Sequence, residues 1–210
     1  RQGEPERPPE PEPEPETDEQ RAERERKEQS LALKNQGDAA YKAKKFDEAV
    51  QLWTEAYELD PTNVVLLTNR AVAYTTQRRF DEALADCEKA IDEGRRLRLD
   101  YAVIARAYER MGGAYSQRGD LKLAIKCYNS SLSECNSAGV LKKLREAEKQ
   151  LEKQEREAYY DDAKAEEART AGNELFKKAD YPEAVKMYTE ALRRNPREVK
   201  IYTNRAAACC

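Results

Sequence analysis

An internal repeat with a period of about 34 residues constrains this chain more than any other feature. In each copy, a small residue is followed nine positions later by an aromatic residue or leucine, and an alanine comes three positions after that. The four copies carry these residues at Gly37, Phe46 and Ala49; at Ala71, Phe80 and Ala83; at Gly112, Leu121 and Ala124; and at Gly172, Tyr181 and Ala184. A sequence with such a period folds as a stack of similar units, each burying its apolar face against its neighbours.

The period and the residue pattern are those of the tetratricopeptide repeat, in which each unit is a pair of antiparallel helices. We therefore predict an all-α fold, a tetratricopeptide-repeat superhelix (α-solenoid) of antiparallel helix pairs. The small residue lets the two helices of a pair approach closely, and large residues such as Trp53 fill the core. The expected helices span residues 31–44, 47–59, 64–77, 80–95, 98–117 and 121–134, with turns at 60–61 and 118–120.

The third copy begins later than the period requires. Ala83 and Ala124 are 41 residues apart, seven more than the period, so we expect two extra helical turns around residues 94–104. After the third copy, an apolar stripe with helical spacing predicts a helix whose first half caps repeat three and whose second half, at 152–157, is a polar spacer. The stripe consists of Val140, Leu141, Leu144, Ala147 and Leu151.

These features divide the chain into four segments. We expect a disordered Pro/Glu-rich linker at 1–17, a three-repeat domain with an extended first helix at 18–137, a capping and linker helix at 138–160, and a truncated second repeat domain at 161–210. Residues 17–20 read Thr-Asp-Glu-Gln and fit a capping box at the start of the extended first helix. Because a continuous core needs about three repeats, the short second domain predicts that the chain is a piece of a longer protein.

The charge of the chain is concentrated at its N-terminal end. Residues 1–30 hold eleven acids against six bases, whereas the rest of the chain is near neutral, with 32 bases and 30 acids. A near-neutral body argues against nucleic-acid binding, which usually needs a basic excess. No run of apolar residues is long enough for a transmembrane helix. We therefore expect neither a nucleic-acid partner nor a membrane partner.

The residues on which most catalytic and metal sites depend are absent. The chain has no histidine, which excludes Ser-His-Asp and Cys-His catalysis and removes the commonest metal ligand. It has no glycine-rich phosphate loop, and its five cysteines form no CxxC pair. A two-carboxylate hydrolase stays formally open, but carboxylates on so charged a helical surface are better read as a solvated face. We predict a non-enzymatic monomer of the cytoplasm, with no cofactor and no metal.

Two internal matches indicate a binding groove. Residues 68–71 and 203–206 both read Thr-Asn-Arg-Ala, and in each case a basic residue precedes the asparagine by the same distance, with a polar residue four after the base. The two sets are Lys34, Asp38 and Asn69, and Arg169, Asn173 and Asn204. The first helix of each pair lines the concave face of such a stack. Since cations and amide donors suit a carboxylate, we interpret these sets as parts of two grooves for a terminal carboxylate.

Repeat three adds two further cations to the first groove. Arg106 and Arg110 lie one helical turn apart and face the same way. With Lys34 and Asn69 they would form a cationic pocket for two adjacent carboxylates. The alternative, that all of these are ordinary surface residues of a repeat protein, is equally compatible with the spacing.

Three segments carry a resemblance to a known family: YKAKKFD at 41–47, ELDPTN at 58–63 and DYPEA at 180–184. Residues 31–210 resemble the second and third repeat domains of the Hop family, the stress-inducible co-chaperones that organise Hsp70 and Hsp90. The resemblance implies a scaffold that holds the C-terminal Glu-Glu-Val-Asp tails of heat shock proteins 90 and 70 in dicarboxylate clamps. The matching positions are Lys34, Asp38, Asn69, Arg106 and Arg110 in the first clamp, Tyr41 for an apolar peptide contact, and Arg169, Asn173 and Asn204 in the second.

Asp38 stands where the family's clamp has asparagine, and Arg106 where it has lysine. Asp38 places an anion beside the site for an anion, and at ~4 Å with an effective dielectric near 20 the repulsion is roughly 4 kcal/mol. Lys34 can neutralise Asp38, but is then partly withdrawn from the peptide. We hypothesise that this clamp binds acidic tails weakly, or with uptake of a proton.

Other readings stay open beside the Hop-like scaffold. One is another tetratricopeptide co-chaperone, such as a J-domain protein with similar repeats. Another is an assembly scaffold outside the chaperone system whose groove ignores carboxylates, which Asp38 favours. An enzymatic reading requires a catalytic domain beyond Cys210.

Overall fold

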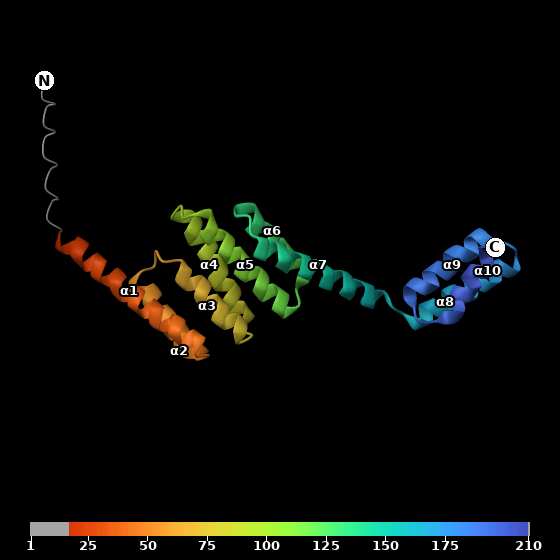
Figure 1. The fold of residues 1–210 in the computed structure, drawn as a ribbon, viewed down its shortest axis with the longest axis horizontal. Helices are drawn as coiled ribbons and strands as arrows, with labels where there is room; N and C mark the ends of the chain where they lie inside the picture. The colour runs from red at the N-terminus through yellow and green to blue at the C-terminus, as the bar shows by residue number, and fades with distance from the viewer. Residues whose placement is uncertain (1–16, 210) are drawn as a thin grey trace, which may run out of the picture. The chain divides into compact units, whose positions relative to one another are not determined.

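The computed structural model describes residues 17–209, so the terminal Cys210 and all of the expected linker at 1–17 except Thr17 lie outside the described residues. Thr17 caps the first helix instead of belonging to the linker. The described residues form ten α-helices joined by short turns (Figure 1). Their contacts divide them into two compact units, residues 17–141 and 142–209. The boundary between the units falls within α7 (Ala138–Tyr159).

The first unit contains three consecutive helix pairs. The helices are α1 (Asp18–Lys42), α2 (Phe46–Leu59), α3 (Val65–Thr76), α4 (Phe80–Arg96), α5 (Tyr101–Arg118) and α6 (Leu121–Glu134). Each odd-numbered helix packs against the next helix in the chain, and each pair packs against the following pair (Figure 1). The predicted tetratricopeptide-repeat architecture is therefore confirmed.

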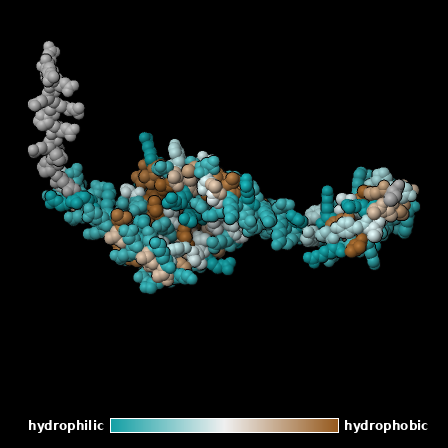
Figure 2. All heavy atoms as spheres, viewed as in Figure 1, coloured by the Kyte–Doolittle hydropathy of each residue, from teal (hydrophilic) through white to brown (hydrophobic). Residues whose placement is uncertain are grey.

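The start of α1 is determined by the capping box. Thr17 Oγ1 accepts a hydrogen bond from the Gln20 amide at 3.2 Å, and Gln20 Oε1 accepts one from the Thr17 amide at 2.9 Å, as predicted. Residues 18–29 are all exposed, and Figure 2 shows hydrophilic side chains along this part of the helix. Pairs one turn apart, such as Lys27 and Glu23 at 2.6 Å, support a helix that has no core to pack on.

The seven extra residues before the third pair lengthen two helices, as expected. Helix α4 has 17 residues where α2 has 14, and α5 has 18 where α3 has 12. Helix α5 begins at Tyr101, three residues later than the expected 98. The reason is that Asp100 caps this helix, since its carboxylate accepts a hydrogen bond from the Ala102 amide at 2.8 Å.

Within each pair, the turn between the helices uses a left-handed residue. Lys44, Arg78 and Ala179 have φ values of 62°, 62° and 57°, and Gly119 has 98°. The next amide in each turn bonds back to the carbonyl five residues earlier, as in Lys45 to Ala40 at 2.9 Å, which closes the end of the first helix. Only glycine adopts this conformation without steric cost, so three of the four turns carry backbone strain.

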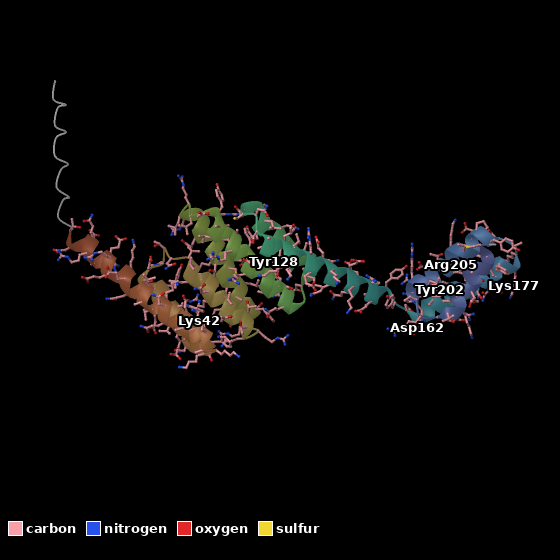
Figure 3. All side chains as sticks on the ribbon, viewed as in Figure 1. Lys42, Tyr128, Asp162, Lys177, Tyr202 and Arg205 are labelled. Carbon is pink, nitrogen blue, oxygen red and sulfur yellow. The ribbon has the colours of Figure 1, made fainter. Side chains whose placement is uncertain are left out.

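A glycine in the first helix of a pair receives an aromatic ring from the second. A Cβ added to Gly37 would lie 2.6 Å from Trp53 Nε1, one on Gly112 would lie 2.7 Å from Tyr128, and one on Gly172 would lie 2.8 Å from Tyr188. The spacing from the glycine to the ring is the same in all three pairs. All three rings are buried, including Tyr128 between α5 and α6 (Figure 3), which confirms the prediction of a core position for Trp53.

A buried ion pair ties together three helices of the first unit. Arg70 Nε donates to Asp86 Oδ2 at 2.7 Å, Arg70 Nη2 donates to Asp86 Oδ1 at 2.6 Å, and Arg70 Nη1 donates to Thr54 Oγ1 at 2.8 Å. The hydrogen bonds to the Asp86 carboxylate raise the pKa of Arg70 above its usual range. The arginine of the repeated Thr-Asn-Arg-Ala segment therefore has a structural role in the first unit.

The second unit contains most of α7 and the helices α8 (Asp162–Lys177), α9 (Tyr181–Arg194) and α10 (Val199–Ala208). In α7, Val140, Leu144 and Ala147 of the apolar stripe are buried, whereas residues 152–157 are exposed. That this helix caps repeat three stays a prediction. None of the helices described in residues 17–209 combines the length and apolar character that a membrane span requires.

Adjacent glycines in α5 give a matched test of the close helix contact. We expect Gly112→Ala to lower the free energy of unfolding of the first unit by about 1–3 kcal/mol, because the new methyl group overlaps the Tyr128 ring. Gly113 has nothing within 4 Å of an added Cβ, so Gly113→Ala should raise it by up to about 1 kcal/mol through helix propensity. Urea unfolding followed by fluorescence of the single tryptophan reports on this unit, and equal effects of the two changes would contradict the packing argument.

The left-handed turns predict a stabilising glycine substitution. We expect Lys44→Gly to raise the free energy of unfolding by about 0.5–1 kcal/mol, because glycine removes the steric cost of a positive φ. The neighbouring Lys45 has a φ of −89°, so Lys45→Gly should destabilise the unit instead. The same tryptophan-detected unfolding compares them, and shifts of the same sign would show that strain at residue 44 is not the cause.

Candidate peptide-binding site

Three of the predicted groove residues are joined by hydrogen bonds between α1 and α3. Lys34 Nζ lies 2.8 Å from Asp38 Oδ2, one helical turn along α1. Asn69 Nδ2, from α3, donates to Asp38 Oδ1 at 3.2 Å. The structure thus brings Lys34, Asp38 and Asn69 together, and that they hold a peptide carboxylate stays a prediction.

Trp53 is a further member of this network that sequence reasoning placed only in the core. Its indole Nε1 donates to Asp38 Oδ1 at 3.1 Å. The ring packs on Gly37, the residue immediately before Asp38, so the close contact that buries the ring also directs its N–H toward the carboxylate. The signal that identifies it is the constant spacing between the glycine and the ring in three of the repeats.

Asp38 is therefore the centre of the first cluster rather than an isolated anion. Oδ1 accepts hydrogen bonds from Trp53 and Asn69, and Oδ2 faces the ammonium of Lys34. The side chains of Lys34 and Asp38 are 23% and 33% exposed, so a ligand can reach them while solvent screens them only in part. This pairing reduces the repulsion expected from Asp38, and it engages one of the three donors of Lys34.

Arg106 and Arg110 project from α5, which packs beside α3 and α4. Arg106 is exposed and Arg110 is half-buried. Neither forms an ion pair with any of residues 17–209, and neither is hydrogen-bonded to Lys34, Asp38 or Asn69. Among the partners that residues 17–209 offer, neither guanidinium group has a hydrogen-bond acceptor.

Tyr41 contacts two aromatic rings of its own repeat and one hydroxyl of the next repeat. Its ring is half-buried, with centroid distances of 5.4 Å to Phe46 and 5.8 Å to Trp53. Its hydroxyl lies 3.3 Å from Thr76 Oγ1 on α3. These contacts fix the ring at the end of α1, and its predicted contact with apolar peptide residues stays a prediction.

The second unit repeats the arrangement with a neutral residue at the centre. Asn173 Oδ1 accepts hydrogen bonds from Tyr188 OH at 2.8 Å and from Asn204 Nδ2 at 3.0 Å. Tyr188 packs on Gly172 as Trp53 packs on Gly37, and burial raises the pKa of its hydroxyl. Because Oδ1 of Asn173 accepts both bonds, its amide nitrogen is left to donate to a ligand.

A pocket of about 420 Å³ opens at this second cluster. It is lined by Thr170, Asn173, Glu174, Phe176, Lys177, Tyr188, Asn204 and Ala207. Lys177, at the end of α8 (Figure 3), lies 2.8 Å from Glu174 and brings a cation to the rim. The pocket combines amide donors with aromatic rings, which suits a peptide that ends in polar and apolar groups.

Arg169, the first base of the second groove, is held by carboxylates. Its Nε donates to Glu166 Oε2 at 2.8 Å and its Nη2 donates to Glu166 Oε1. Glu198 Oε1 lies 3.9 Å from the same Nε. The hydrogen-bonded Glu166 raises the pKa of Arg169, and Arg169 lowers the pKa of Glu166. The sequence motif gave no indication of these acidic partners.

Cys87 and Cys127 are buried thiols with raised pKa values. Burial raises the pKa of the Cys87 thiol to about 12 and that of the Cys127 thiol to about 11, so both are protonated at neutral pH. Both are buried and unpaired, whereas Cys135 and Cys209 are exposed. Within residues 17–209 no group of three or more acidic or cysteine side chains is placed to hold a metal ion.

Comparison with known families gives three matches to the tetratricopeptide repeat, at residues 30–63, 63–133 and 169–209. The Hsp70-Hsp90 organizing protein of Triticum aestivum is 44% identical over 182 residues, which cover 85% of this chain and 31% of the relative. Stress-induced-phosphoprotein 1 of Caenorhabditis elegans is 43% identical over 178 residues, covering 85% of this chain and 56% of the relative. The chain thus spans from about a third to a little over half of the length of these relatives.

Solved structures agree with these relatives. The complex of the TPR2AB domain of yeast Sti1 with pHSP90 superposes with a TM-score of 0.79 at 44% identity, covering 85% of this chain and 69% of that one. The first repeat domain of Spaghetti (RPAP3), bound to the HSP90 peptide SRMEEVD, gives a TM-score of 0.52 at 32% identity, covering 60% and 94%. The resemblance to the Hop family is confirmed. The chain belongs to the tetratricopeptide-repeat family and, within it, to the group of Hsp70-Hsp90 organizing proteins.

Proposed function

We propose that this chain is a non-catalytic co-chaperone adaptor that binds the acidic C-terminal tails of Hsp90 and Hsp70. The observation that carries the proposal is the cluster of Lys34, Asp38 and Asn69 across α1 and α3, which recurs as Asn173 and Asn204 in the second unit. A hydrogen bond between corresponding polar side chains of two helices, Asn69 to Asp38 and Asn204 to Asn173, thus occurs twice in one chain. In the related Sti1 and Spaghetti domains, the partner is an Hsp90 peptide.

The unused donors of the first groove suit a terminal carboxylate. Lys34 gives one donor to Asp38 and Asn69 gives one amide hydrogen, so both keep donors for a ligand. Arg106 and Arg110 supply two uncommitted guanidinium forks, each able to bind a carboxylate through two parallel hydrogen bonds. In this arrangement Lys34 and Asn69 hold the terminal carboxylate, and the two arginines hold the acidic side chains of the tail.

Because Lys34 is paired with Asp38, a peptide carboxylate that binds Lys34 competes with a carboxylate of the protein. To engage a peptide carboxylate, the ammonium of Lys34 shares its donors between Asp38 and the ligand, and the negative charge of Asp38 stays close by. Asn173 at the corresponding position of the second unit carries no charge and keeps its amide donors. The first groove therefore binds acidic tails more weakly than an asparagine-containing groove would.

Two grooves in one chain favour a scaffold. Each groove recognises a short tail, and single contacts of this kind are weak, so joining them raises the effective concentration of the second partner. The unactivated thiols fit an adaptor rather than an enzyme, and the buried, unpaired Cys87 and Cys127 suit the reducing cytoplasm. A scaffold whose groove ignores carboxylates is the second candidate, because Asp38 opposes a ligand anion.

Blocking the carboxylate of the ligand separates the two candidates. We expect a Glu-Glu-Val-Asp peptide to bind, and its C-terminally amidated twin to bind at least roughly tenfold more weakly, because hydrogen bonds to charged groups contribute about 1.5–3 kcal/mol. Isothermal titration calorimetry with the whole chain measures both dissociation constants. Binding that is indifferent to amidation would favour the second candidate.

Substitution of the central acid measures its effect on affinity. We expect Asp38→Asn to tighten peptide binding roughly tenfold, about 1.4 kcal/mol, because it frees Lys34 and adds an amide donor. Asp92→Asn, an equal change of charge at an exposed position of α4, serves as the control and should leave the affinity unchanged. If both variants bind like the unmodified chain, Asp38 does not oppose the ligand.

A further inference from the structure

The first cation of the second groove, Arg169, already binds a carboxylate of the protein. The guanidinium of Arg169 is engaged by both oxygens of Glu166, in the paired geometry with which arginine binds a ligand carboxylate. The Arg169 side chain is 25% exposed, so it is reachable from solvent. A ligand that uses this arginine must therefore replace a carboxylate that belongs to the protein.

Glu198 adds a second internal acid at the same cation. It stands immediately before α10, in the position where a side chain usually accepts a hydrogen bond from the first turn of a helix. Its side chain makes no such capping bond, and instead lies 3.9 Å from Arg169 Nε. The two acids thus reach Arg169 from two different elements of the unit.

The first groove shows that the repeat itself does not require these acids. The residue three before Lys34 is Leu31, which is 52% exposed, and the residue six before Asn69 is Asn63. These positions correspond to Glu166 and Glu198, and neither carries a charge. The acidic pair is therefore a feature of the second groove alone, and folding of a helix pair does not account for it.

We propose that Glu166, supported by Glu198, is a specificity-determining residue of the second groove that occupies the fork of Arg169 in place of a ligand carboxylate. The proposal rests on the function proposed above and concerns which tails the second groove accepts. Exchange of one carboxylate for another brings little net gain, because the same hydrogen bonds are broken and made.

The internal acids thereby select for a particular kind of ligand. A peptide with a single carboxylate gains almost nothing at Arg169. A peptide that also reaches the amides of Asn173 and Asn204 gains contacts for which the protein has no internal substitute. Specificity here arises from a built-in competitor as well as from attraction.

The test compares two neighbouring glutamates of α8 in the whole chain. The probe is an acetylated Glu-Glu-Val-Asp peptide with a free C-terminus, titrated into isotope-labelled protein. The side-chain amide NMR signals of Asn173 and Asn204 report binding at the second groove, and that of Asn69 reports binding at the first. We expect Glu166→Gln to tighten binding at the second groove roughly two- to fivefold, which matches the free energies of exposed ion pairs.

Glu167→Gln is the matched control, because it removes the same charge from the same helix at an exposed residue that forms no ion pair within residues 17–209. The Glu167→Gln change should leave the dissociation constant of the second groove unchanged. The Glu198→Gln change should increase the affinity of this groove by less than Glu166→Gln does. Equal affinities for the Glu166 and Glu167 variants overturn the proposal and leave the adaptor function standing. Shifts confined to Asn69 in every variant also overturn it, while absence of shifts at both grooves overturns the adaptor function as well.

Discussion

The close approach of glycine to an aromatic ring within a helix pair is the contact on which the geometry of the two polar clusters depends. In the first pair the missing side chain of Gly37 lets Trp53 lie against the backbone of α1, so its N–H reaches the next residue, Asp38. In the fourth, Gly172 admits Tyr188, whose hydroxyl reaches Asn173. One packing contact therefore sets the helix spacing and also orients the central polar side chain of each groove.

The two polar clusters share one arrangement of helices but differ in where their acidic side chains lie. In the first, the acid lies at the centre, where Asp38 is bound by Trp53, Asn69 and Lys34. In the second, the centre is the neutral Asn173, and the acids surround Arg169. In both cases the first cation is paired with a carboxylate of the protein, Lys34 with Asp38 and Arg169 with Glu166. The binding that we propose is therefore an exchange between carboxylates rather than the filling of an empty positive site.

Much of the fold could be predicted because the same pattern of small, aromatic and alanine residues recurs in four copies of the repeat. The period located the helix pairs, the extra seven residues located the longer α4 and α5, and the Thr17 box located the start of α1. These are local or periodic effects, decided by residues within a few turns of each other. The repeated Thr-Asn-Arg-Ala segment also indicated that Asn69 and Asn204 occupy equivalent positions, since equal spacing puts equivalent residues on equivalent faces.

The sequence by itself therefore determined the repeat architecture, the family and the two small polar clusters, Lys34, Asp38 and Asn69, and Asn173 and Asn204. Only the tertiary structure decided what those residues bind in the absence of a ligand. Lys34 and Glu166 lie within one helical turn of Asp38 and Arg169. The contacts of Asp38 with Trp53 and Asn69, and of Arg169 with Glu198, join residues far apart in the chain, and no local pattern encodes them. Whether a charged residue is free or already paired depends on these contacts, because hydrogen bonds act over about 3 Å in space and not over distance in sequence.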